Sequence, residues 1–121
     1  MVFGVRGAIL VAEDTREHIW SSARKLVAEM RIRNSLEESE IVSIQFSLTG
    51  DLTAGNPAEG LRKAGYSATP LFCTAEAKVA GGMPRTLRAL LTAESGRVAD
   101  RRNVAHVYLD GAEALRPDLS A

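Results

Sequence analysis

The hydrophobic residues near the start of the chain alternate with polar or small residues. Over residues 2–11 this alternation predicts a strand, one face of which carries Phe3, Val5, Ile9 and Val11. Arg6 falls on the opposite face between Gly4 and Gly7, and we expect these glycines to leave room for close approach to its guanidinium group. The pattern therefore predicts a strand that carries a cation on its less apolar face.

The period then changes to that of a helix. Apolar residues spaced three and four apart predict one long amphipathic helix over residues 15–33, with a stripe formed by Ile19, Ala23, Leu26, Val27 and Met30. Asp14 precedes this segment and Glu17 follows three residues later, which is the pattern of a capping box. We therefore expect Asp14 to cap the helix and residues 34–35 to end it.

A second strand and a short helix are predicted next. Residues 40–49 alternate, with Val42, Ile44, Phe46 and Leu48 on one face and Ser43, Gln45 and Ser47 on the other. Asn56 followed by Pro57 is typical of a helix start, because asparagine caps well and proline tolerates the first helical position. We expect this short helix to span residues 57–64 and to end at Gly65.

The remaining pattern predicts three strands and an α+β fold. The strands are expected at residues 68–74, 85–93 and 104–109; the second could be a helix by propensity, but a strand is favoured. The resulting order is strand, helix, strand, helix and three strands, which predicts a mixed sheet with one long and one short helix on one face. Residues 1–121 suit a single domain. The uncovered face of the sheet needs a partner, so we expect an oligomer.

Composition excludes some classes of partner. The 15 basic and 15 acidic residues cancel and the pI is about 6.7, so the chain lacks the charge expected of a protein that binds nucleic acid or anionic membranes. Arginine outnumbers lysine, which suits bidentate carboxylate binding, although codon bias would give the same composition. The balance therefore favours a small ligand over a polyanion.

Single residues and spacings narrow the choice further. Cys73 is the only cysteine, so no intrachain disulfide is expected, which fits a reducing, cytoplasmic setting. Arg6 and the acidic pair at residues 13–14 argue against a signal peptide, and no apolar run is long enough to span a membrane. Two distant histidines and one cysteine predict no metal site, and Gly81–Gly82 alone is too weak a signal for a phosphate-binding loop.

Three arginines carry the strongest chemical signal. Arg6 and Arg88 interrupt apolar runs that predict buried strands, and Arg116 opens a short segment near the end of the chain. A guanidinium group keeps its charge and is rarely buried without an anion. Internal carboxylates or a bound ligand could supply that anion; we favour a ligand with two carboxylates. The other candidate residues for such a site are Glu76, Tyr108 and Cys73.

At these residues the chain resembles the AroH-type chorismate mutases, the small trimeric class typified by the Bacillus subtilis enzyme. The resemblance runs from residue 3 to residue 119 and depends on several motifs in a fixed order. The matching segments are Val5-Arg6-Gly7-Ala8, Glu13-Asp14-Thr15, Asp51-Leu52 with Pro57-Ala58, Cys73 with Glu76, Gly81-Gly82 leading to Arg88, His106-Val107-Tyr108-Leu109, and Leu115-Arg116-Pro117-Asp118-Leu119. One of these motifs alone would be weak, but the set is specific.

The resemblance implies a cofactor-free isomerase. Members of this family carry out the Claisen rearrangement of chorismate to prephenate, on the route to phenylalanine and tyrosine. They are homotrimers whose active sites lie between subunits, and their mixed sheets assemble into a barrel-like core. This expectation agrees with the uncovered sheet face predicted from the pattern.

The resemblance also implies a role for each candidate residue. Arg88 corresponds to the catalytic arginine that faces the ether oxygen of the substrate. Arg6 and Tyr108 would hold a carboxylate, and Glu76 would accept a hydrogen bond from the ring hydroxyl. Phe72, Cys73, Thr74 and Ala75 would line the substrate, and Arg62 and Arg116 would close the entrance.

Two positions depart from the family pattern, and two other functions compete with this one. Asn56 stands where a large aromatic residue is common, and Glu59 stands where the Bacillus enzyme has a lysine; both changes bear on substrate affinity more than on reaction type. A non-catalytic trimer that binds a small carboxylate would show affinity without turnover. A different chorismate-using or enamine-handling enzyme on a similar scaffold would form another product.

Overall fold

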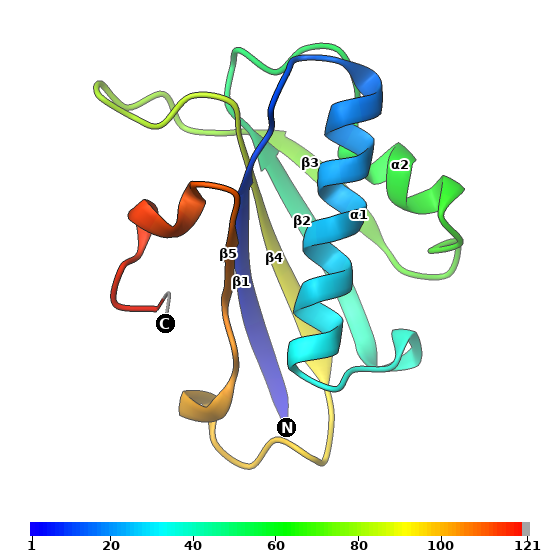
Figure 1. Cartoon of the computed structure of the whole chain (residues 1–121). Coiled ribbons are helices and arrows are strands. Elements are labelled where there is room, and N and C mark those ends of the chain that lie inside the picture. The colour runs from blue at the N-terminus through cyan, green and yellow to red at the C-terminus, as the bar shows by residue number, and fades with distance from the viewer. Residues whose placement is uncertain (120–121) are drawn as a thin grey trace.

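Five strands form one mixed sheet in the order β3-β2-β4-β1-β5 (Figure 1). The computed structural model describes residues 1–119. The elements are β1 (Val2–Leu10), α1 (Arg16–Arg33), β2 (Ile41–Leu48), α2 (Pro57–Lys63), β3 (Leu71–Ala75), β4 (Thr86–Glu94) and β5 (Val107–Leu109), with short 3₁₀ turns at Glu38–Glu40, Arg101–Asn103 and Ala112–Leu115. This order confirms the predicted α+β fold. None of the helices in residues 1–119 is both long and apolar enough to cross a membrane.

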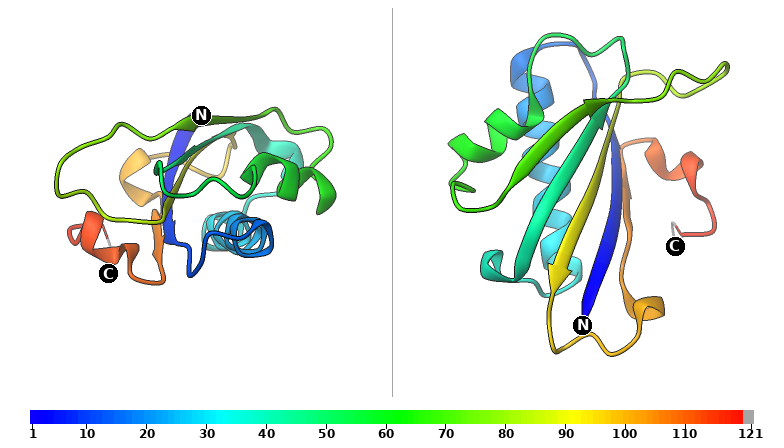
Figure 2. Two further views of the ribbon diagram at one scale, coloured as in Figure 1. Left: turned by 90° about the horizontal axis from the view of Figure 1, so that it is seen from above. Right: turned by 180° about the vertical axis from the view of Figure 1, so that it is seen from behind.

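The two helices cover one face of the sheet and leave the other uncovered (Figure 2). Strand β4 pairs antiparallel with β1 and β2, whereas β3 pairs parallel with β2 and β5 pairs parallel with β1. The core lies between the sheet and α1. Its largest fully buried side chains include Val5, Ile9, Ile44, Phe46, Leu87 and Leu91 from the strands and Ile19, Leu26, Val27 and Met30 from α1. The predicted apolar stripe of the long helix is therefore confirmed.

The cap of α1 differs from the prediction. Thr15, not Asp14, is the N-cap, and its hydroxyl accepts a hydrogen bond from the backbone N–H of His18. The Asp14 carboxylate instead accepts hydrogen bonds from the backbone N–H groups of Thr53 and Ala54. These bonds, that from Ala54 first, lower the pKa of Asp14 below its ordinary value. Asp14 thus ties the start of α1 to the loop before α2.

Strand β2 contains an irregularity that the alternation did not predict. The pairing between β2 and β4 shifts its register between Ile41 and Ser43. Because a bulge adds one residue to one strand, it reverses the facing of the residues before it. Val42 is therefore exposed rather than on the core face, and Ile41 takes the buried position.

The other boundaries follow the sequence with small changes. Asn56 caps α2 by accepting a hydrogen bond from the backbone N–H of Ala58, and Gly65 follows the helix with φ of 106°, as predicted. The strand expected at residues 85–93 is confirmed as β4. Strands β3 and β5 begin three residues later than predicted.

Gly7 has a different role from the predicted one. It faces α1, where an added Cβ would lie 2.5 Å from Met30 Sδ and 3.2 Å from a Leu26 methyl carbon. Any larger residue would push against this close helix–sheet contact, so Gly7 allows α1 to pack near β1. It does not create space for the Arg6 guanidinium group, which lies on the other face of β1.

Candidate active site

A row of side chains crosses the uncovered face of the sheet. Ser47 on β2 lies opposite Arg88 on β4, and Arg88 lies opposite Ala8 on β1. Ala8 in turn lies opposite Tyr108 on β5, and Ser47 lies opposite Thr74 on β3. Because directly paired residues share a face of the sheet, strand pairing alone aligns all five side chains.

A second row runs parallel to the first, two residues along each strand. Arg6 lies opposite Leu90, Leu90 opposite Gln45, and Gln45 opposite Phe72. Arg6 is therefore a diagonal neighbour of Arg88, a relation that places the Cα atoms of two such residues roughly 7–8 Å apart. The sheet thus holds two cations side by side, at a separation that suits a ligand with two anionic groups.

The two rows border a cavity of about 270 Å³. Its lining includes Arg6, Gln45, Ser47, Thr74, Arg88, Leu90 and Tyr108, together with Gly7, Phe46 and Ala89. Ala8 lies between Arg88 and Tyr108 and is only 1% exposed, although it points to the uncovered face. The two long side chains therefore enclose it, and the small alanine forms the floor of the cavity.

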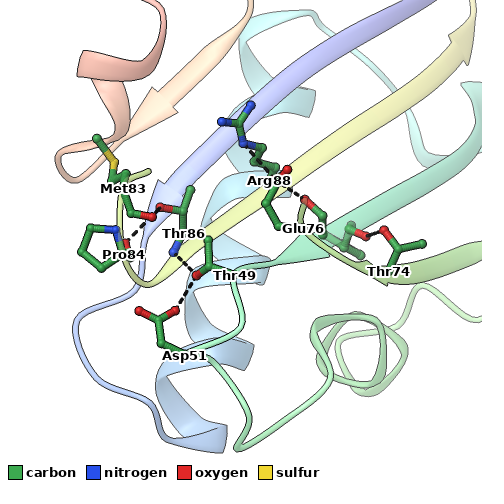
Figure 3. A network of polar contacts seen from close by, with 10 residues as sticks. Thr49, Asp51, Thr74, Glu76, Met83, Pro84, Thr86 and Arg88 are labelled. Atoms are coloured by element: carbon green, nitrogen blue, oxygen red, sulfur yellow. Dashed lines mark hydrogen bonds and ion pairs between the residues drawn. The ribbon is translucent and has the colours of Figure 1, made fainter. Parts of the chain in front are cut away.

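Glu76 and Arg88 form an ion pair at the edge of this cavity (Figure 3). Arg88 Nε lies 3.0 Å from Glu76 Oε1, and the Ser47 hydroxyl donates a hydrogen bond of 2.7 Å to the same oxygen. Glu76 is the first residue after β3, and its backbone N–H donates to the Leu48 carbonyl oxygen. The carboxylate is thus brought beside Arg88 by the end of a strand.

A second polar network anchors the far end of the loop that joins Glu76 to β4 (Figure 3). The Thr49 hydroxyl donates to Asp51 and accepts from the backbone N–H of Thr86, and the Asp51 carboxylate accepts from the backbone N–H of Arg85. The bond from Thr49, with that from Arg85 adding to it, holds the pKa of Asp51 below its ordinary value. These bonds fix the start of β4, two residues before Arg88.

Arg6 is held through its backbone. Its N–H donates to His106 Nδ1 at 2.9 Å, which joins β1 to the segment that leads into β5. Burial, followed by the positive charges of Arg6 and Arg116, lowers the pKa of His106 below its usual value. A neutral His106 can accept this bond, and the Arg6 guanidinium group has no ion-pair partner within residues 1–119.

The end of the described chain lies near Arg6 and Tyr108. Arg116 forms a two-point ion pair with Asp118, with nitrogen–oxygen distances of 3.0 and 2.8 Å. This hydrogen bonding raises the pKa of Arg116, and the nearby Tyr108 adds to the effect. Arg6, Tyr108 and Asp118 also line a wider hollow of about 1020 Å³ beside β5. Arg116 lines neither this hollow nor the smaller cavity, but its electrostatic effects place it close to His106 and Tyr108.

Three other predicted site residues lie elsewhere in the chain. Cys73 pairs with Phe46 and packs against the core, so its thiol faces away from Arg88, and burial raises the pKa of that thiol. Ala75 pairs with Leu48 at the end of β3, and Arg62 is exposed on α2, outside the cavity lining. Any contact of Cys73 with a ligand in this cavity would be made through its backbone.

The premise that the two arginines are buried was wrong for the single chain. Both lie on the uncovered face, and the Arg88 side chain is 49% exposed. Arg88 has an internal carboxylate partner in Glu76. Of the two predicted sources of an anion, an internal carboxylate or a bound ligand, the structure therefore shows the first for this residue. The sequence reasoning assigned no role to Ser47, Gln45 or Leu90 in the site. Their alternation with core residues placed them on the correct face but did not distinguish them from solvent-exposed positions.

The arrangement can bind and stabilise negative charge. Two guanidinium groups and a tyrosine hydroxyl border a cavity that also offers one carboxylate as a hydrogen-bond acceptor. Within residues 1–119, no group of three or more histidine, cysteine, aspartate or glutamate side chains is arranged to hold a metal ion. The geometry therefore suits recognition of a dianion that also carries a hydroxyl group.

Comparison with known proteins agrees with this geometry. The family model described as chorismate mutase type I matches residues 2–119. The chain is 41% identical to a chorismate mutase AroH from Thermus thermophilus, with 100% of this chain and 98% of the relative aligned, and 34% identical to a chorismate mutase AroH from Bacillus subtilis (99% and 94%). A solved chorismate mutase from Clostridium thermocellum is 36% identical and superposes with a TM-score of 0.88, covering 93% of this chain and 98% of that one. The chain therefore belongs to the chorismate mutase type I family, the AroH type of isomerase.

Proposed function

We propose that this protein converts chorismate to prephenate, without a cofactor, in the cytoplasmic route to phenylalanine and tyrosine. The observation that carries the proposal is the Arg88–Glu76 pair at the edge of a cavity that Arg6 and Tyr108 also line. Membership of the chorismate mutase type I family supports the same reaction. We further propose that residues 1–121 act as one catalytic domain, of which the family match covers residues 2–119.

The reaction needs stabilisation of charge rather than proton transfer. In this rearrangement the ether carbon–oxygen bond of chorismate breaks while a carbon–carbon bond forms within the same molecule. Negative charge develops on the ether oxygen, so a fixed cation there stabilises the transition state more than the ground state. Arg88 supplies that cation: Glu76 engages its Nε, and its terminal nitrogens remain available to the ether oxygen.

The other residues hold the substrate in a reactive shape. Arg6 and Tyr108 bind a carboxylate, and Glu76 accepts a hydrogen bond from the ring hydroxyl. The β3 residues Phe72, Cys73, Thr74 and Ala75 line the substrate, Cys73 through its backbone, while Arg62 and Arg116 close the entrance. Holding a flexible dianion in one conformer supplies a second, entropic part of the acceleration. An acceleration of about 10⁶ corresponds to about 8 kcal/mol in total.

We also propose that the site is completed by a second copy of the chain in a homotrimer. The cavity of about 270 Å³ is slightly smaller than the roughly 300–1,000 Å³ of typical small-molecule sites, and it opens onto the uncovered face. Phe72 and Leu90, which border this face, are 59% and 43% exposed. Exposed apolar residues around an incomplete site are typical of an interface, and Arg62 would reach the substrate from the neighbouring subunit.

A charge at the centre of the uncovered face should break the assembly. We expect Leu90→Asp to shift the protein from trimer to monomer and to lower turnover by about 10²-fold or more, because burying a new carboxylate in the interface is costly and that carboxylate would also compete with the substrate for Arg6, which lies directly opposite. Sedimentation velocity and a turnover assay on the same samples check both effects. Ile32→Asp is the matched control, since Ile32 is 70% exposed on α1 on the opposite side of the sheet. A Leu90→Asp variant that stays trimeric and active would contradict the interface.

The function itself is tested by incubating the purified protein with chorismate. The loss of chorismate is followed by ultraviolet absorbance and the product is identified by chromatography, with a chelator present. We expect prephenate as the product. Affinity for chorismate without turnover would support a non-catalytic binding module instead, and a different product would assign the same site to another chorismate-using reaction.

A further inference from the structure

We infer that Ser47 is a positioning residue for the reaction, because it fixes the Glu76 carboxylate and, through it, the Arg88 guanidinium group. This inference rests on the proposed function. Its basis is one oxygen atom with two partners: Glu76 Oε1 accepts a hydrogen bond of 2.7 Å from Ser47 Oγ and lies 3.0 Å from Arg88 Nε in an ion pair. Ser47 therefore joins the two residues that carry the chemistry.

The position of Ser47 in the sheet suits this role. It lies on β2, directly opposite Arg88 on β4 and directly opposite Thr74 on β3, two residues before Glu76. Ser47 is half-buried and paired with a neighbouring strand on each side, so its backbone and Cβ are held in place. Residues on regular strands hold a site more precisely than residues on loops do.

Glu76 needs such support because it lies where strand β3 ends and a loop begins. It is the first residue after β3, and the exposed loop that follows contains Gly81 with φ of 78° and Gly82. A glutamate side chain has several rotatable bonds, and a surface ion pair to an arginine with a 49% exposed side chain would leave it several conformers. The Ser47 hydroxyl adds a second fixed point, at hydrogen-bond distance from the same oxygen.

Because Ser47 and Arg88 share one oxygen of Glu76, other atoms of Glu76 and Arg88 are left to contact the substrate. With both of these contacts at Oε1, the second carboxylate oxygen of Glu76 is left to accept a hydrogen bond from the ring hydroxyl of chorismate. With Nε engaged by Glu76, the terminal nitrogens of Arg88 are left for the ether oxygen. Ser47 thus acts on both substrate contacts without needing to touch the substrate, which is why it is a positioning residue and not a catalytic one.

The prediction is a fall in kcat with little change in KM. We expect Ser47→Ala to lower kcat by about 10- to 100-fold, the range that a hydrogen bond to a charged group is worth, while KM stays within about twofold. Ser47→Thr keeps the hydroxyl and should restore most of the loss. Ser47→Cys nearly keeps the shape but loses the strong donor, and should behave like Ser47→Ala.

Two comparisons separate positioning from a structural effect. Ser43→Ala changes a serine on the same strand and the same face, opposite Thr92, and should leave kcat and the unfolding midpoint unchanged. In a Glu76→Ala background, Ser47→Ala should have no further effect on kcat, because the group that it positions is gone. Effects of Ser47→Ala and Glu76→Ala that simply multiply would overturn the inference.

Failure of this inference is distinguishable from failure of the proposed function. A wild-type protein that forms prephenate, with a Ser47→Ala variant equally fast, would overturn the role of Ser47 and leave the function intact. A wild-type protein that does not consume chorismate would overturn the function, and the inference about Ser47 with it.

Discussion

Replacing Arg88 with alanine is expected to abolish most turnover while the fold and the assembly persist. We expect kcat/KM to fall by about 10³-fold, equivalent to about 4 kcal/mol of transition-state stabilisation. The loss should lie mainly in kcat, since the charge that Arg88 faces develops only in the transition state. Steady-state kinetics with chorismate measures the loss. Far-ultraviolet circular dichroism and sedimentation check that the structure is unchanged, as expected for a side chain that is half exposed in the single chain.

Two further variants make this test specific. Arg88→Lys keeps a positive charge but loses the planar group that reaches Glu76 through Nε, so it should recover only part of the activity. Arg102→Ala removes an arginine that is paired with Asp100 on the surface and should leave turnover unchanged. Near-normal turnover in Arg88→Ala would refute the electrostatic assignment.

Replacing Arg6 with alanine is expected to weaken substrate binding instead. Arg6 binds a carboxylate that carries its charge in both the ground state and the transition state. Arg6 therefore stabilises the two states equally. We expect KM to rise by about 10²-fold, with kcat changed by less than about fivefold. Initial-rate kinetics over a wide range of chorismate concentration separates the two constants.

The control for Arg6 is another arginine on the same side of the molecule. Arg101 lines the hollow beside β5 with Arg6, but it is not part of the active-site cavity, and its NH2 group lies 3.5 Å from the Val2 carbonyl oxygen. Arg101→Ala should therefore leave KM near the wild-type value. If Arg6→Ala lowered kcat and left KM unchanged, Arg6 would have to be assigned to the reacting bonds rather than to a carboxylate.

The order of the elements could be predicted from local pattern because each element has a clear period. The alternation in residues 86–94 and the helical stripe of α1 both follow from which side chains face the core. The α1 cap could not be predicted in this way. Asp14 and Thr15 are both good capping residues, and the choice between them depends on the loop at Thr53, 39 positions from Asp14, which takes the carboxylate.

Strand register was the second feature that could not be predicted from the sequence. The bulge at Val42 exists because β2 must match β4, a partner about 50 residues away in the chain, and no local feature marks it. The same holds for Cys73, whose facing follows from its pairing with Phe46. Strand pairing is a property of the folded sheet, so the facing of single residues near a bulge or at a strand end is poorly predicted from alternation.

The resemblance named the main residues of the candidate site, and strand pairing in the structure shows how they are arranged. The motifs assigned Arg6, Glu76, Arg88 and Tyr108 to one site. Strand pairing places Arg6, Arg88 and Tyr108 on the same face of the sheet. The bond from Ser47 to Glu76 joins residues 29 positions apart and has no signature in the sequence. Polar residues that act through a neighbour are found only once the contacts are known.

The most direct test of the central claim is chromatographic identification of the product when equal amounts of wild-type protein and the Arg88→Ala variant are incubated with chorismate. The account predicts prephenate from the wild type and prephenate formation about 10³-fold slower from the variant. Prephenate formed equally by both proteins, or no prephenate from the wild type, would contradict it.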